Sequence, residues 1–133
     1  MSDRFRLDTI GQIHIGVDDC ERAVAFCRDV LGMRFLFDVP AQSMAFFDCG
    51  GIRLYLGKVE SAEIRSNPLI YYRVADIHEA HAALQARGVV FLGQPHAIHR
   101  TDTHELWLAG FRDSEGNYLH LMSEAPLNER REG

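Results

Sequence analysis

The pattern of apolar and polar residues occurs twice along the chain in the same order. Residues 12–32, QIHIGVDDCERAVAFCRDVLG, and residues 69–88, LIYYRVADIHEAHAALQARG, each start with an alternating run and continue with apolar residues at helical spacing. Alternation at a period of two predicts a strand, and recurrence three and four residues apart predicts an amphipathic helix. The chain therefore contains an internal repeat, which constrains architecture more firmly than local propensity does.

The two predicted helices have matching start and stop signals. Asp18 or Asp19 can cap the first helix and Asp76 the second, because a short carboxylate accepts hydrogen bonds from the free N–H groups of a first turn. Gly32 and Gly88 supply the left-handed residue that ends a helix. The expected buried stripes are Ala23, Phe26, Cys27, Val30 and Leu31 in the first helix and Ile77, Ala80, Ala83 and Leu84 in the second.

Three strand-like runs follow each helix. They are MRFLFDV, SMAFFDC and GIRLYLG in the first half and VVFLG, ELWLAGF and YLHLM in the second. Asp48 to Gly51 and Asp113 to Gly116 are matching turns between the last two strands of each half. The order is thus βαβββ twice, which predicts an α+β fold of two tandem modules whose curled mixed sheets surround a cleft.

The repeat also predicts the domain organisation. A chain of 133 residues fits one domain, since about 150 residues per domain is the usual guide. The offset between repeats grows from 57 residues at Asp19 and Asp76 to 65 at Asp48 and Asp113, and the polar stretch 93–104 is the expected loop that holds the insertion. The predicted segments are module one at 10–57, a linker at 58–68, module two at 69–124 and a mobile tail at 125–133.

Composition excludes several functional classes. The chain has no run of about 18 apolar residues and no basic-then-apolar N-terminus, so a cytoplasmic protein without membrane contact is expected. The net charge of −5 opposes the broad basic face that binds nucleic acid. Three cysteines without a C-x-x-C pair suggest neither a disulfide framework nor a thiolate zinc site.

Two segments resemble a known superfamily. IHIGVDDCERAVAFCRDVLGM and FRDSEGNYLHLM are similar to the opening and closing elements of the vicinal oxygen chelate superfamily, which includes glyoxalases, bleomycin-type resistance proteins and extradiol dioxygenases. The resemblance covers residues 10–124 and implies a homodimer. In members that bind a divalent metal, the ligand positions would correspond here to Gln12, Tyr55, Leu69 and His120. Leu69 cannot coordinate a metal, and a neutral Tyr55 is a poor ligand because a phenol titrates near pH 10.

Strand alternation adds neighbours to these positions. His14 shares a face with Gln12, Arg53 shares one with Tyr55, and Tyr71 and Arg73 share the face of Leu69. The resulting candidates for substrate binding are Gln12, Tyr55, Tyr71, Arg73 and Trp107, although the sequence does not fix which face of its strand Trp107 occupies. If Arg73 points inward, an anionic substrate group could pair with it; an outward, solvated arginine is the alternative.

The histidines allow several interpretations. His14 and His120 are either catalytic, or neutral imidazoles satisfied by local hydrogen bonds, or ligands of a metal together with Gln12. In the metal-binding interpretation the cofactor is one divalent ion, Zn, Ni, Mn or Fe. In the other two interpretations no cofactor is needed. The remaining histidines are expected in solvent, with His96, His99 and His104 in a loop or lid and His78 and His81 on the exposed side of the second helix.

Two functions follow from the resemblance and these residues. The first is a glyoxalase-like enzyme of the lyase or isomerase type, in which His120 is a general acid or base and His14 positions it. The alternative is a metal-free protein of the bleomycin resistance type that sequesters a small molecule. Tyr55, Leu69, Tyr71 and Trp107 would then supply stacking surface, and the acidic balance would favour a cationic ligand.

Overall fold

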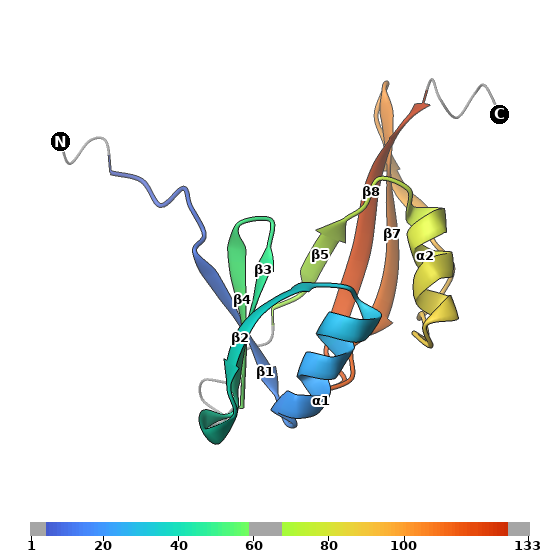
Figure 1. Cartoon of the computed structure of the whole chain (residues 1–133). Helices are drawn as coiled ribbons and strands as arrows, with labels where there is room; N and C mark the ends of the chain where they lie inside the picture. The colour runs from blue at the N-terminus through green and yellow to red at the C-terminus, as the bar shows by residue number, and fades with distance from the viewer. Residues whose placement is uncertain (1–4, 59–67, 128–133) are drawn as a thin grey trace. The chain divides into compact units, whose positions relative to one another are not determined.

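The computed structural model of the chain describes residues 5–58 and 68–127 (Figure 1). The chain separates into two compact units, residues 1–68 and 69–133, and each is described by itself. Each unit has one four-stranded mixed sheet and one α-helix against a face of that sheet (Figure 1). The predicted α+β fold with two βαβββ modules is confirmed, and neither sheet closes into a barrel.

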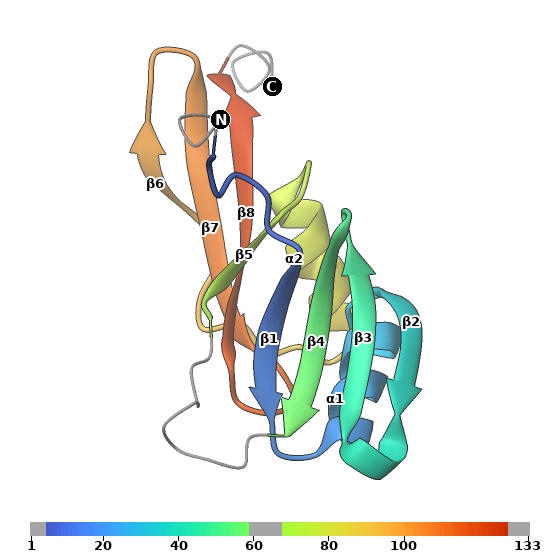
Figure 2. The same cartoon turned by 90° about the vertical axis from the view of Figure 1, so that its left-hand side faces the viewer.

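The first unit follows the predicted order closely. Its elements are β1 (Gln12–Val17), α1 (Cys20–Ala25), the π-helical turn η2 (Phe26–Val30), β2 (Arg34–Val39), the short 3-10 turn η3 (Pro40–Gln42), β3 (Met44–Cys49) and β4 (Ile52–Lys58). The strands lie side by side in the order β1-β4-β3-β2 (Figure 2). Strands β1 and β4 are parallel, whereas the other neighbours are antiparallel.

The second unit repeats this topology. Its elements are β5 (Ile70–Arg73), α2 (Ile77–Ala86), β6 (His96–Arg100), β7 (His104–Arg112) and β8 (Tyr118–Pro126). The strand order is β5-β8-β7-β6, with β5 parallel to β8. In the described residues, neither α-helix has the length and apolar character that crossing a membrane requires.

The predicted helix signals are found in the structure. The Asp19 carboxylate accepts a hydrogen bond from the backbone N–H of Arg22 at 3.0 Å, and Asp76 accepts from the N–H groups of the first turn of α2. Gly32 and Gly88 adopt the left-handed conformation, with φ of 72° and 93°. The first helix departs from the prediction after Ala25, because its second half widens into η2.

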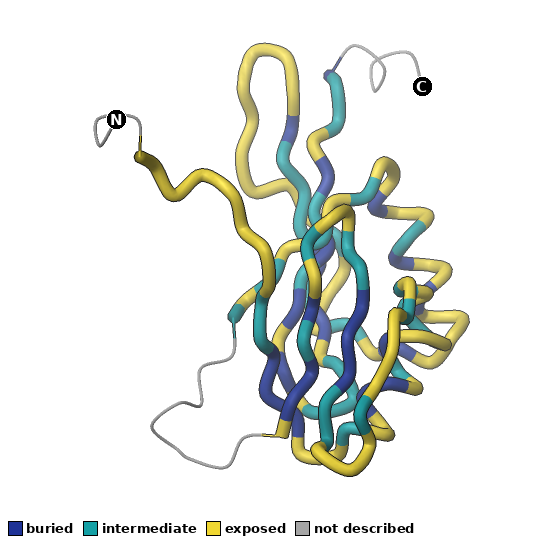
Figure 3. The backbone as a smooth tube through the Cα atoms, turned by 60° about the vertical axis from the view of Figure 1, so that its left-hand side comes forward, coloured by how far each residue is buried: buried dark blue, intermediate teal, exposed yellow. Residues whose placement is uncertain are grey.

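Each unit buries apolar residues between its helix and one face of its sheet (Figure 3). The first core contains Ile15, Val17, Ala23, Val24, Cys27, Ala45, Phe47, Leu54 and Leu56, and the second contains Ile77, Leu84, Val89, Ala109, Phe111, Leu119 and Leu121. The opposite face of each sheet is free of its own helix. We call it the open face of that sheet.

One strand lies where a loop was predicted. The segment VVFLG forms only an isolated bridge between Phe91 and Phe111, and the strand that follows α2 is β6, inside the predicted loop 93–104. All residues of β6 are exposed, and its register shifts between Ala97 and His99. An exposed, irregular edge strand has no alternation for the sequence to reveal. Accordingly, His96, His99 and His104 lie in strands rather than in a loop.

The buried side of α2 and the ends of β4 and β8 also differ from the prediction. His81 is 6% exposed on the core side of α2 and contacts the Phe91 ring, whereas Ala83 is exposed. Strand β8 extends through Pro126, and the backbone N–H of Leu127 donates to Thr103, so the start of the predicted tail is ordered. Lys58 belongs to β4 rather than to the linker; residues 59–67 and 128–133 lie outside the described residues.

Candidate functional site

Four rings lie in a continuous line on the open face of the first sheet. Phe37 of β2 stacks on Phe46 of β3 at 4.6 Å between ring centroids, Phe46 stacks on Tyr55 of β4 at 4.9 Å, and Tyr55 contacts His14 of β1 edge-on at 4.7 Å. We call Phe37, Phe46, Tyr55 and His14 the aromatic row. It crosses all four strands of the sheet, one ring from each.

Backbone register produces the aromatic row. Phe37 is opposite Phe46, Phe46 opposite Tyr55, and Tyr55 opposite His14, and directly opposed side chains in a sheet have Cβ atoms about 5 Å apart. The register shift between Phe35 and Phe37 is essential, because residues two apart on a regular strand share a face. Phe35 is opposite the core residue Phe47, so without the shift Phe37 would also face the helix.

Gly57 makes room for two rings of the row. A Cβ atom at this position would lie 2.9 Å from Nε2 of His14 and 2.9 Å from Cε1 of Tyr55. Real Cβ atoms essentially never approach so closely, so both rings lean over the bare backbone of Gly57. The sequence gives no indication of this contact, because Gly57 follows Tyr55 by two residues in a run that predicts an ordinary strand.

A polar row runs beside the aromatic row on the same face. Register places Arg34, Asp48, Arg53 and Gln12 in line across β2, β3, β4 and β1. Arg53 Nε donates a hydrogen bond to Gln12 Oε1 at 2.8 Å, and the Arg53 guanidinium lies 5.5 Å from the centroid of the Phe46 ring. The side-chain oxygen of Gln12, which was predicted to bind a metal, therefore already accepts a hydrogen bond from the Arg53 guanidinium.

The second sheet has a shorter version of the same arrangement. Tyr71 of β5 stacks on His120 of β8 with centroids 4.8 Å apart. Histidine and tyrosine have exchanged places relative to His14 and Tyr55, because Tyr71 is on the parallel edge strand and His120 is on its neighbour. Gly110 is opposite His120, where the first sheet has Phe46 opposite Tyr55.

The His120 ring lies over the bare backbone of Gly110, where a Cβ atom would be 3.2 Å from Nε2 of His120. Its Nδ1 atom is buried without a hydrogen-bond partner among the described residues. Burial lowers the pKa of His120 below the usual 6.5, and the nearby His96 lowers this pKa further. Both effects favour the neutral imidazole of His120 over the imidazolium.

The other predicted binding residues of the second unit have different surroundings. Arg73 pairs with Glu124 of β8, with Nη2 and Oε1 3.2 Å apart, so a protein carboxylate occupies the place proposed for an anionic substrate group. Trp107 lies on the helix side of β7, where it contacts the ring of His78 on α2. Register thus separates Trp107 from His120, whereas Tyr71 and His120 are brought together.

The described residues of neither unit form a metal site by themselves. In the described parts of the two units, no group of three or more His, Cys, Asp and Glu side chains is placed to hold a metal ion. Three protein ligands are the usual minimum for a catalytic metal. The proposed set of Gln12, His14 and His120 draws on both units and stays a prediction, as does the convergence of the two histidines.

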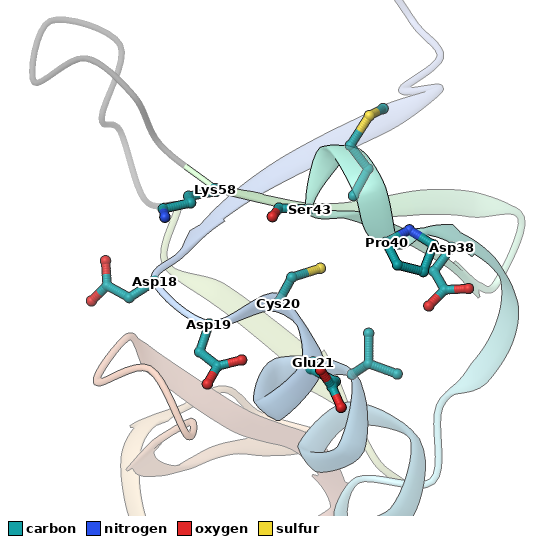
Figure 4. A pocket seen from close by; sticks show the side chains of 10 residues that line it. Asp18, Asp19, Cys20, Glu21, Asp38, Pro40, Ser43 and Lys58 are labelled. Carbon is teal, nitrogen blue, oxygen red and sulfur yellow. The ribbon is translucent and has the colours of Figure 1, made fainter.

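Two pockets of the described residues include neither the aromatic row nor the Tyr71 and His120 pair. In the first unit a pocket of about 600 Å³ lies where α1 begins, beside η3 (Figure 4). Its lining includes the carboxylates of Asp18, Asp19, Glu21 and Asp38 together with Lys58. A second pocket, of about 380 Å³, lies beside the start of α2 and includes His78 and Trp107. Neither pocket contains a ring of the aromatic row.

Comparison with known proteins gives a family match. Residues 9–121 match the family model described as Glyoxalase/Bleomycin resistance protein/Dioxygenase superfamily. No curated protein matches the chain.

Solved structures give three informative likenesses. A member of the glyoxalase/bleomycin resistance protein/dioxygenase superfamily from Sphaerobacter thermophilus is 26% identical, with a TM-score of 0.72 over 89% of this chain and 98% of that one. Lactoylglutathione lyase from Agrobacterium tumefaciens is 20% identical, with a TM-score of 0.70 over 89% and 95%. TnmS3, an antibiotic binding protein from Streptomyces, is 23% identical, with a TM-score of 0.69 over 92% and 100%.

A methyl group at Gly57 should disturb the aromatic row. We expect Gly57→Ala to turn the rings of His14 and Tyr55 away from each other and to lower the free energy of unfolding by about 1–3 kcal/mol, as overpacking does. Urea denaturation and the ring-proton shifts of His14 measure the two effects. Gly93→Ala is the matched control, because its Cβ meets nothing within 4 Å. Unchanged His14 shifts in Gly57→Ala would contradict the described contact.

The lowered pKa of His120 predicts acid-sensitive stability. Because the unfolded chain binds this proton more readily than the folded chain, stability is unaffected well above pH 6.5 and falls as the pH drops below 6.5 towards the folded pKa. His120→Gln should therefore lose less stability than the wild type between neutral and mildly acidic pH, as measured by urea denaturation. His99→Gln, an exposed histidine of β6, is the control. Equal acid sensitivity in wild type and His120→Gln would refute the assignment.

Proposed function

The chain belongs to the Glyoxalase/Bleomycin resistance protein/Dioxygenase superfamily, and we propose that it binds a planar small molecule on the open face of its first sheet. The observation that carries this proposal is the aromatic row. Members of this superfamily bind small molecules, and one structural relative is described as an antibiotic binding protein. From these relatives we take only the class of ligand, a small organic molecule.

The aromatic row offers surface of suitable shape and chemistry. Phe46 is the most buried ring of the row, at 8% exposed. Phe37 is 47% exposed, and His14 and Tyr55 are half-buried. Each aromatic contact contributes about 0.5–1.5 kcal/mol beyond the burial of apolar area. Because neighbouring rings already hold one another in place, a flat ligand would lose little binding energy to ordering of the side chains.

This proposal needs no metal ion. Binding relies on ring stacking and apolar area, and Gln12 is occupied by Arg53. It corresponds to the sequestration alternative, with Phe37, Phe46, Tyr55 and His14 as the stacking surface in place of Tyr55, Leu69, Tyr71 and Trp107. Trp107 lies on the helix side of its sheet, and Leu69, although 49% exposed, belongs to the second unit.

A second candidate function is proton transfer by His120. A neutral imidazole can act as a general base, so the lowered pKa favours abstraction of a substrate proton over its donation. Tyr71 stacks on the ring, and Gly110 leaves the space beside it without a side chain. The glyoxalase-like enzyme, with a divalent ion or without one, therefore stays a proposal centred on His120, and the homodimer stays a prediction.

Calorimetric titration with naphthylmethanol, a neutral flat probe, tests the binding function. In the presence of a chelator we expect saturable binding to the wild type and roughly tenfold weaker binding to Tyr55→Ala, which removes the central phenol ring of the row. Tyr118→Ala, which truncates an exposed tyrosine of the second unit, should bind as the wild type does. Identical affinity of the wild type and Tyr55→Ala would reject the aromatic row as the binding surface.

Turnover of the hemithioacetal of methylglyoxal and glutathione tests the second function, with and without added Zn, Ni, Mn or Fe. Removal of a general base usually costs about 100-fold or more, so His120→Gln should show a loss of that size in kcat/KM. Wild-type kcat/KM should fall on acidification because only the neutral imidazole accepts the proton, and the lowered pKa places this fall at a more acidic pH than for an ordinary histidine. His99→Gln is the control. Equal activity of wild type and His120→Gln would eliminate this candidate.

A further inference from the structure

We propose that the ligand of the aromatic row is an anionic aromatic molecule, such as an aromatic carboxylate, whose negative group is bound by Arg53. This inference rests on the proposed function and adds the charge of the ligand to it. Arg53 is on the same strand and the same face as Tyr55. A spacing of two residues places the two positions roughly 7 Å apart along β4, a distance comparable with the length of a bicyclic aromatic acid.

Local contacts hold the Arg53 guanidinium in position. Its Nε donates to the side chain of Gln12 at 2.8 Å, and its Cζ atom lies over the Phe46 ring, 5.5 Å from the ring centroid. Among the described residues, its two Nη groups have no hydrogen-bond partner. A guanidinium binds a carboxylate best through two parallel N–H groups, so Arg53 is prepared to receive one.

The charges of the polar row favour an anion. Arg34 and Arg53 contribute two positive charges, and Asp48, which register places between them, contributes one negative charge. No ion pair joins Asp48 to Arg53 in the described part of the chain, so the arginine charge is not cancelled by direct pairing. The polar row therefore carries a net charge of +1, from two arginines minus one aspartate, although the whole chain carries −5.

This local charge changes the expectation drawn from composition. The overall acidic balance suggested a cationic ligand, but electrostatic attraction between exposed groups falls off over about 8–10 Å in physiological salt. Charged groups beside the aromatic row therefore affect the binding of a ligand there more than carboxylates elsewhere on the chain do. The carboxylate cluster that could attract a cation lines a different pocket, beside α1 (Figure 4).

Three probes that share one ring system separate the charge of the ligand from its shape. They are naphthoate, naphthylmethanol and naphthylmethylammonium, titrated by calorimetry into the full chain. We expect naphthoate to bind about threefold to thirtyfold more tightly than naphthylmethanol, since a charge-assisted contact at an exposed site has this range of strength. Added salt should weaken the binding of naphthoate and leave that of naphthylmethanol nearly unchanged.

Arg53→Gln should abolish the preference for naphthoate and keep the affinity for naphthylmethanol within about twofold, because the aromatic row stays intact. Arg53→Lys should retain part of the preference, since it keeps the charge and loses the planar fork. Arg28→Gln is the matched control: it makes the same change in net charge at an arginine of η2 that pairs with Asp29. Urea denaturation of each variant shows that it is folded.

The outcomes distinguish the two levels of the proposal. Saturable binding of naphthylmethanol without preference for naphthoate overturns the inference and leaves the proposed function in place. A preference for naphthylmethylammonium, or a preference for naphthoate that persists in Arg53→Gln, also overturns the inference. Absence of saturable binding by all three probes overturns the proposed function and the inference together.

Discussion

Cross-strand register in the first sheet is the constraint on which the candidate site depends. Tyr55 is opposite both Phe46 and His14, so its phenol ring joins two neighbouring strands into one surface. The line reaches β2 because a single register shift turns Phe37 to the open face. Gly57 permits the close approach of His14 and Tyr55 at the other end of the aromatic row. A change of one residue in pairing would send these rings to the helix side, because successive side chains point to opposite faces.

The duplicated module shows how one framework can present two different chemistries. In the first sheet the edge strand carries His14 and its neighbour carries Tyr55, whereas in the second the edge strand carries Tyr71 and its neighbour carries His120. Gly110 replaces the ring that Phe46 supplies in the first sheet. The first open face is therefore a stacking surface, and the second presents an imidazole that lies over the bare backbone of Gly110 and whose pKa is lowered by burial and by His96.

Much of this could be predicted from sequence because repeat, caps and turns are local signals. Asp19, Asp76, Gly32 and Gly88 perform the predicted roles, and strand alternation correctly places His14 on the face of Gln12. Phe37 could not be predicted, because its face depends on a register shift that no residue type announces.

Other features depended on tertiary contacts. The sequence does not fix the face that Trp107 occupies, because both faces of β7 carry apolar residues. The contact with His78 places Trp107 on the side of α2. The partner of Arg73, Glu124, lies 51 residues further along the chain and becomes its neighbour only through the pairing of β5 with β8. Strand β6 is fully exposed and so resembled a loop.

The central claim is that the aromatic row is the surface on which a flat ligand is bound. Intermolecular nuclear Overhauser effects between bound naphthylmethanol and the isotope-labelled protein test this claim most directly. We expect contacts from the probe to ring protons of Phe37, Tyr55 and His14, together on one face of the first sheet. Contacts confined to residues of the pocket beside α1, such as Val24 and Pro40, would contradict it.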